Sequence, residues 1–78
     1  MGFNNSKILN PKIMKKSSIK KGQIYTVKFP LMLRIIRITV IEVTKNEVKY
    51  LYTDKDQDVM DIFSFVSNCE MGYLRLVH

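Results

Sequence analysis

Residues 33–53 read LRIIRITVIEVT KN EVKYLYT and decide the fold class of this chain. In the last part, Val48, Tyr50 and Tyr52 alternate with more polar neighbours, which predicts a strand with one apolar face. Residues 33–44 are dense in β-branched side chains, and such density favours strand over helix. Asn46 lies in the short segment between them and tolerates positive φ, so we predict a tight antiparallel hairpin.

The first strand of this hairpin alternates irregularly. Ile36 and Val40 fall on one face of an ideal strand, but Ile41 and Val43 fall on the other. Both faces therefore carry large apolar side chains, and both need cover. We predict that the strand bends or bulges near Arg37–Thr39 and contributes to two packed sheets.

Two further strands and one helix are predicted around the hairpin. Ile24–Phe29 alternates in the same way, and Tyr73–Val77 is typical of a short closing strand. Residues 54–58 form a polar connector after the hairpin. An apolar stripe then predicts a helix near residues 58–68, with Asp58 as its expected N-cap. The stripe consists of Val59, Ile62, Phe63 and Val66.

The beginning of the chain has a different composition from the rest. Residues 1–22 are rich in Asn, Ser and Lys, of which Asn and Ser favour turns and loops, and Gly22 ends this region. A short helix over Pro11–Lys16 and a flexible arm are both compatible with this composition. We predict a basic N-terminal arm over residues 1–19, helical in part or flexible, followed by one mainly β domain with one helix over residues 20–78.

The order of these elements resembles that of small SH3-like barrels. The stretches Lys20–Tyr25, Ile41–Thr44 and Val48–Tyr52 also look like those of small orphan proteins from bacteriophages and mobile elements. The resemblance covers about residues 20–78. It implies a non-enzymatic binding module, commonly for nucleic acid or a host protein. For the fold we predict either a small SH3-like barrel or a bent antiparallel sheet.

Acidic residues are absent from the first half of the chain. Residues 1–41 hold nine of the thirteen Lys and Arg residues and no Asp or Glu, which gives a formal charge of +9. Residues 42–78 hold all seven acids and four basic residues, which gives −3, and the sum is the net charge of +6. This asymmetry indicates a polyanionic or acidic partner.

Two groups of residues are candidates for contact with that partner. The basic group, which would match phosphates or an acidic protein, consists of Lys12, Lys15, Lys16, Lys20, Lys21, Arg34 and Arg37. The apolar group, which would anchor a protein partner, consists of Met32, Leu51 and Tyr73. Other roles stay open: the arm lysines would also serve solubility, and the arginines would also protect a sheet edge. Three tyrosines are either stacking platforms or core residues, namely Tyr25, Tyr50 and Tyr52.

The sequence lacks the constellations that catalysis and metal binding need. Cys69 is the sole cysteine and His78 the sole histidine, so we expect the cysteine to be a small buried side chain. The acidic run 54–58 matches the start of a calcium loop, but Val59 and Phe65 stand where Gly and a bidentate Glu are needed. We therefore expect no enzymatic activity, no cofactor, no metal and no small-molecule substrate.

We also expect a soluble, cytoplasmic protein. A single cysteine excludes an internal disulfide, which fits a reducing compartment. The N-terminus lacks the apolar core of a signal peptide. The most apolar region, residues 30–43, is interrupted by Arg34, Arg37 and Glu42, so it falls short of the ~20 apolar residues of a membrane helix.

Two function classes follow from these observations. The first is a module that binds nucleic acid through its basic N-terminal half. The second is a phage-type inhibitor or adaptor, in an anti-defence or host-takeover role. It would cover an acidic patch of a host protein, or pair an exposed edge strand with that target. In either class we expect a monomer or weak head-to-tail self-association.

Overall fold

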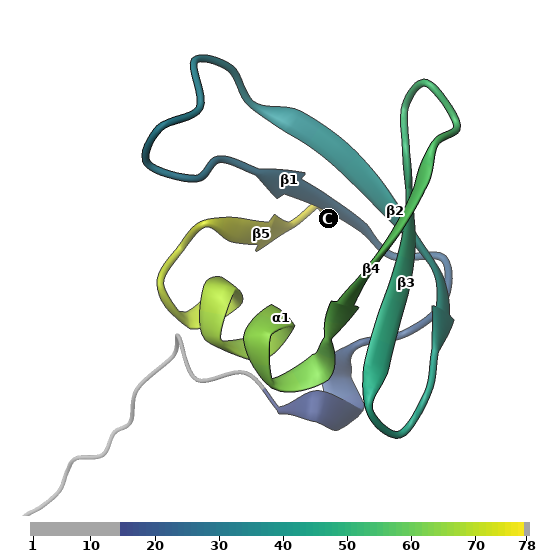
Figure 1. The fold of residues 1–78 in the computed structure, drawn as a ribbon. Helices are drawn as coiled ribbons and strands as arrows, with labels where there is room; N and C mark the ends of the chain where they lie inside the picture. The colour runs from purple at the N-terminus through teal and green to yellow at the C-terminus, as the bar shows by residue number, and fades with distance from the viewer. Residues whose placement is uncertain (1–14, 78) are drawn as a thin grey trace, which may run out of the picture.

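The computed structural model describes residues 15–77, which form a five-stranded antiparallel sheet and one α-helix (Figure 1). The mainly β fold with one helix that the sequence predicts is confirmed. The elements in chain order are η1 (Lys16–Ser18), β1 (Ile24–Val27), β2 (Ile36–Val43), β3 (Glu47–Tyr52), β4 (Gln57–Asp61), α1 (Ile62–Glu70) and β5 (Leu74–Leu76).

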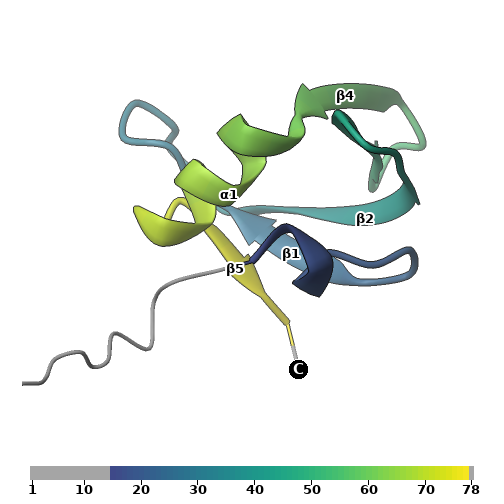
Figure 2. The ribbon, with the colours of Figure 1, turned by 90° about the horizontal axis from the view of Figure 1, so that it is seen from below.

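The last strand returns to lie beside the first. The strand order is β4-β3-β2-β1-β5, so β1 to β4 form a meander and β5 adds to the free side of β1. The sheet bends strongly, and α1 lies between the two edge strands and contacts both (Figures 1 and 2). One bent sheet therefore forms the body of the domain, and not the two packed sheets predicted from β2.

The core lies between the sheet and α1. Tyr25 of β1 and Phe65 of α1 are fully buried, and their rings meet edge to face with 5.0 Å between centroids. This arrangement suits the ring quadrupoles and joins helix to sheet at the centre of the domain. The buried core residues are Ile19, Tyr25, Val27, Ile38, Val40, Val48, Tyr50, Ile62, Phe65 and Leu74.

A β-bulge explains the irregular alternation of β2. Pairing with β3 is regular up to Val40 and resumes at Glu42, so Ile41 is the extra residue. One extra residue reverses which side chains face the core. Val43 therefore packs against the core and Glu42 is exposed. The predicted irregularity exists, but it lies at Ile41 and not at residues 37–39.

The β2–β3 turn is as short as predicted, but a threonine closes it. The Thr44 Oγ1 accepts hydrogen bonds from the backbone N–H of Glu47 (3.0 Å) and of Asn46 (3.4 Å). Asn46 does not have positive φ; within residues 15–77 the only non-glycine residue that does is Lys55, at 73°. The carbonyl of Asn46 instead accepts the backbone N–H of Ile62 at 2.8 Å, which fixes the start of α1.

β4 occupies the place of the predicted connector and first helical turn. Gln57–Asp61 pairs with β3 along its whole length, and α1 begins at Ile62 rather than near residue 58. Asp61 is the N-cap, because its side chain accepts two N–H groups of the first helical turn at 3.0 and 3.3 Å. Asp58, the predicted N-cap, accepts a hydrogen bond from the Tyr52 hydroxyl at 3.1 Å.

The apolar stripe of the helix is also shifted along the chain. Ile62 and Phe65 are buried, and Val66 and Cys69 pack against the core at the same i, i+3, i+4 and i+7 spacing. Phe63, which the sequence places in the stripe, is 63% exposed. The shift follows from β4, which removes residues 57–61 from the helix.

The predicted N-terminal arm reaches the core at its last residue. Ile19 is 4% exposed and belongs to the core, and η1 before it contacts α1. The folded body therefore includes Ile19, which the sequence assigns to the arm. Of the predicted helix over Pro11–Lys16, only Lys15 and Lys16 lie within the described residues, and residues 1–14 of the arm lie outside them.

Candidate functional site

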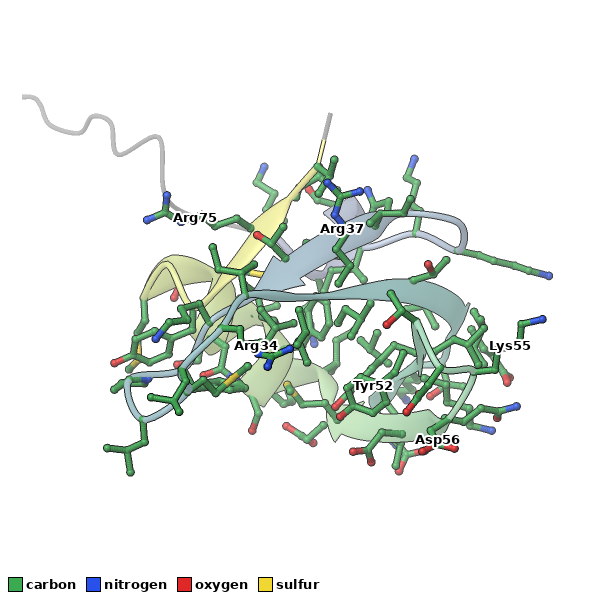
Figure 3. All side chains as sticks on the ribbon, turned by 90° about the horizontal axis from the view of Figure 1, so that it is seen from above. Arg34, Arg37, Tyr52, Lys55, Asp56 and Arg75 are labelled. Atoms are coloured by element: carbon green, nitrogen blue, oxygen red, sulfur yellow. The ribbon has the colours of Figure 1, made fainter. Side chains whose placement is uncertain are left out.

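The face of the sheet that α1 leaves uncovered, here called the outer face, carries Thr26, Arg37, Thr39, Leu51 and Arg75. Thr26 of β1 pairs with Arg37 of β2 on one side and with Arg75 of β5 on the other. Strands lie about 4.8 Å apart, so the two arginine side chains start roughly 10 Å apart. Figure 3 shows the Arg37 side chain pointing away from α1, whereas Arg75 extends along the α1–β5 connection, where its Nε donates to the carbonyl of Gly72. We call Arg75, Thr26 and Arg37, which lie side by side on three neighbouring strands, the Arg75–Thr26–Arg37 row.

The two arginines have no acidic partner within residues 15–77. The only ion pair in this range joins Lys49 and Glu42, with 3.4 Å between nitrogen and oxygen. The Arg75 Nε donates to the carbonyl oxygen of Gly72 at 3.2 Å. That bond orients the guanidinium and leaves its two terminal nitrogens available, and Arg37 is exposed beside it. The row therefore presents positive charge that nothing in the described fold neutralises.

The fold gathers the acid-free parts of the chain. Residues 1–41 and 71–78 contain no Asp or Glu, and they supply β1, most of β2 and β5. Residues 42–70 hold all seven acids with three basic residues, so the three segments carry +9, −4 and +1, which again sum to +6. In Figure 3, Asp56 and Lys55 of the β3–β4 hairpin lie far from Arg37 and Arg75.

The structure brings only some of the predicted basic residues toward the outer face. Arg37 lies on it, and Arg34 lies in the loop before β2. Lys20 and Lys21 lie in the turn before β1, next to the bulge, because the Gly22 N–H donates to the Val40 carbonyl at 2.8 Å. These two lysines line a shallow open hollow with Ile41, Glu42 and Val43.

The remaining predicted lysines lie elsewhere. The Lys16 Nζ lies 4.3 Å from the ring centroid of Phe63, which is a cation–π contact on the side of α1. Lys15 precedes η1 and is exposed. Lys12 lies outside the described residues. The arm lysines and the outer face are thus separate groups in this structure.

Two residues of the row, Arg75 and Thr26, are missed by reasoning from the sequence. Arg75 falls in residues 42–78, whose formal charge is −3, so a comparison of the two halves does not single out this arginine. A signal does exist, because Glu70 is the last acid and a closing strand is predicted directly after it. What the sequence does not contain is the pairing of this strand with β1, which puts Arg75 beside Thr26.

The predicted protein anchors also separate. Leu51 lies half-buried on the outer face between Thr39 and Gln57, and Tyr73 follows α1 near the same face. Met32 turns inward: its sulfur accepts the backbone N–H of Phe29 at 3.3 Å, and it packs against the core. Met32 also lines a small apolar pocket of about 160 Å³ at the end of the core. Leu51 and Tyr73 are therefore available to a partner on the outer face, whereas Met32 fills the interior.

The tyrosines divide in the same way. Tyr25 and Tyr50 are core residues, and burial raises the pKa of Tyr25 to about 12, with a smaller contribution from Cys69. Burial also raises the pKa of Tyr50. Tyr52 is half-buried, its ring 5.6 Å from that of Tyr50. None of the three presents an open ring on the outer face.

Cys69 packs against the core, and two of the acids, Asp54 and Asp61, have structural roles. Burial, and to a lesser extent the nearby Glu70, raises the pKa of the Cys69 thiol to about 11, so little reactive thiolate forms at neutral pH. The Asp54 carboxylate accepts a hydrogen bond from the backbone N–H of Asp56 within the β3–β4 turn, and the Asp61 carboxylate caps the N-terminus of α1. Within the described range, no three His, Cys, Asp or Glu side chains gather in a way that could hold a metal ion.

Comparison with protein families, with curated proteins and with solved structures finds no match for this chain. The resemblance to SH3-like barrels of phage orphan proteins therefore stays a prediction. Across residues 15–77, no helix has the length and apolar character needed to span a membrane. The outer face is the feature on which a functional proposal can rest.

Proposed function

We propose that this protein is a non-enzymatic binding module that engages a polyanion, nucleic acid foremost, across its outer face. The observation that carries the proposal is the Arg75–Thr26–Arg37 row, where two arginines from different strands flank a hydroxyl on an uncovered face. Arginine meets phosphate oxygens with a planar set of donors, and threonine adds a further polar contact.

Further positive charges extend this row along β1. Lys20 and Lys21 precede the strand and Lys28 follows it. A strand rises about 3.3 Å per residue, so the extended stretch from residue 23 to residue 28 is roughly 17 Å long, and the turn that holds Lys20 and Lys21 adds to it. Several consecutive phosphates fit along such a path. Backbone contacts of this kind give affinity without sequence preference.

Salt dependence of binding tests the proposal. Arg37→Gln and Arg75→Gln remove the charge and keep most of the side-chain length. For a short single strand followed by fluorescence anisotropy, the slope of log affinity against log salt becomes shallower by about 0.7 for each lost phosphate contact. Lys45→Gln is the matched control, because Lys45 is an exposed cation in the β2–β3 turn.

An unchanged slope in the double variant Arg37→Gln/Arg75→Gln contradicts the proposal. The same measurement with Lys15, Lys16, Lys20 and Lys21 replaced by Gln decides whether these four lysines belong to the interface. A loss of affinity assigns these lysines to the interface. An unchanged affinity for DNA, RNA and any protein target assigns them to solubility.

A protein partner is the second candidate, and the β1–β2 loop favours it. Leu31 and Leu33 are 96% and 98% exposed, and Ile35 is 64% exposed. Several exposed apolar side chains in one loop would suit an interaction surface. In this alternative, a phage-type inhibitor or adaptor covers an acidic host protein with the loop and the outer face.

A pull-down from the native cell separates the two candidates. A protein complex survives nuclease treatment and moderate salt, because apolar burial contributes to it. Leu51→Ser should weaken that complex, since Leu51 lies half-buried on the outer face, and it should leave affinity for nucleic acid nearly intact because it adds no charge to that face. If nuclease dissolves the complex and Leu51→Ser does not change it, the inhibitor alternative is eliminated.

A further inference from the structure

An open hollow lies beside the Arg75–Thr26–Arg37 row. It has a volume of about 450 Å³, which is within the range of small-ligand sites. Two parts of the chain that are distant in sequence form it: residues 26–35, from β1 and the β1–β2 loop, and residues 71–75, from the α1–β5 connection and β5. Its lining residues are Thr26, Lys28, Ile35, Met71, Gly72, Tyr73 and Arg75.

The walls of the hollow are apolar without being part of the core. Ile35 and Met71 are 64% and 62% exposed, so folding leaves most of their surface in water. Tyr73 adds an aromatic wall, and its ring is held by Phe29 with 5.7 Å between centroids. Gly72 has φ of +84°, a conformation that disfavours any other residue, and its missing side chain leaves room next to Arg75.

The charged rim of the hollow belongs to the row already described. Arg75 is oriented by the carbonyl of Gly72, and the Thr26 hydroxyl makes only a loose bond of 3.5 Å to the Arg75 carbonyl. The Lys28 ammonium donates to the carbonyl of Met32 and stabilises the loop. No carboxylate is among the lining residues. An apolar recess with an arginine at its rim suits a flat, uncharged ring that carries an anionic group.

We infer that this hollow takes one unstacked base of a single-stranded nucleic acid, while the adjoining phosphates lie on Arg75 and Arg37. This inference rests on the proposed function and adds a preference for single strands. In a duplex the bases are stacked and paired, so none can enter the hollow, whereas a single strand can turn a base onto apolar and aromatic side chains. An acidic peptide with an apolar anchor has similar chemistry and is the competing occupant.

Three probes of equal length test the inference: an oligothymidylate of about 12 nucleotides, a strand of abasic sites and the matching duplex. The abasic strand keeps the phosphates and removes the bases. We expect oligothymidylate to bind about tenfold more tightly than the abasic strand for each base accommodated, and more tightly than the duplex. Equal affinity for the base-containing and abasic strands overturns the inference. If both still bind with steep salt dependence, the proposed function stands without the hollow.

Side-chain changes locate the effect. Ile35→Ser/Met71→Ser removes two walls and should abolish the preference for bases without changing affinity for the abasic strand. Leu31→Ser is the matched control, because Leu31 is an exposed apolar residue of the same loop that does not line the hollow. The double variant Arg37→Gln/Arg75→Gln should lower the affinity for oligothymidylate and for the abasic strand by the same factor. Loss of binding to an acidic, leucine-containing peptide in Ile35→Ser/Met71→Ser, with equal affinity for the two strands, overturns the inference and assigns the hollow to a protein.

Discussion

The two faces of the sheet use neighbouring residues for different purposes. Tyr25 is fully buried against Phe65, whereas Thr26, the next residue, lies between two exposed arginines. Successive side chains of a strand point to opposite faces, so this division runs through β1, β2 and β5. The inner face holds the domain together, and the outer face adds little to stability. Substitutions on the two faces should therefore affect different measurements.

The largest effect is expected from Phe65→Ala on the inner face. Phe65 is fully buried, so its truncation should lower the free energy of unfolding by about 3–5 kcal/mol, measured by urea denaturation. Phe63→Ala is the control on the same helix. Phe63 is exposed and contacts Lys16, so we expect a loss of about 1 kcal/mol or less. Similar losses for both variants would show that the helix faces are assigned wrongly.

Ile19→Ala tests whether the end of the predicted arm belongs to the inner face. Ile19 is 4% exposed, and truncating a buried isoleucine should cost about 2–4 kcal/mol. Ile24→Ala is the comparison, because Ile24 is 37% exposed beside Thr39, and its loss should be less than about 1 kcal/mol. An unaffected melting temperature in Ile19→Ala would place the boundary of the folded body after this residue.

High pH should lower the free energy of unfolding, because a tyrosine is buried on the inner face. Burial raises the pKa of Tyr25 from 10.0 to about 12, so the unfolded chain loses this proton at a lower pH than the folded chain. The stabilisation is complete below pH 10 and is lost as the pH rises toward 12, by at most about 1.4 kcal/mol per pH unit. Urea denaturation between these values should show this fall, and Tyr25→Phe should reduce it. An identical pH dependence in that variant would contradict the assignment.

The smallest effect on stability is expected on the outer face. Arg37→Gln and Arg75→Gln remove exposed cations without acidic partners, so the free energy of unfolding should change by about 0.5 kcal/mol or less. The same variants should change polyanion binding, as described above. A destabilisation comparable with that of Ile19→Ala would show that the arginines support the fold and would remove the main reason for the proposed interface.

The hairpin of β2 and β3 was predictable because its signal is local. Val48 and Tyr50 are buried and alternate with less buried neighbours, and the bulge of β2 is visible as a change in alternation. The position of the bulge was not predictable, because any of several residues of β2 could be the extra one until the pairing of β2 with β3 is known. Here the pairing with β3 selects Ile41.

β4 was missed because it is a polar edge strand. Asp58 lies in an acidic run, and the residues after it also fit a helical stripe that includes Val59. Pairing with β3 outweighs that helical pattern, since β4 satisfies the backbone N–H and C=O groups on the side of β3 that β2 leaves unpaired. The candidate site was predictable in part: Arg37 was identified from charge alone, whereas Arg75 required the pairing of β5 with β1.

The bond from the Ile62 N–H to the Asn46 carbonyl has a consequence for the order of folding. α1 spans nine residues, which is shorter than the roughly 12–15 that an isolated helix needs in water. Its first amide finds its acceptor only after the β2–β3 turn has closed. Changes at Thr44 should therefore slow refolding, while changes within α1 should mainly accelerate unfolding, so that the hairpin acts as the nucleus and the helix docks last.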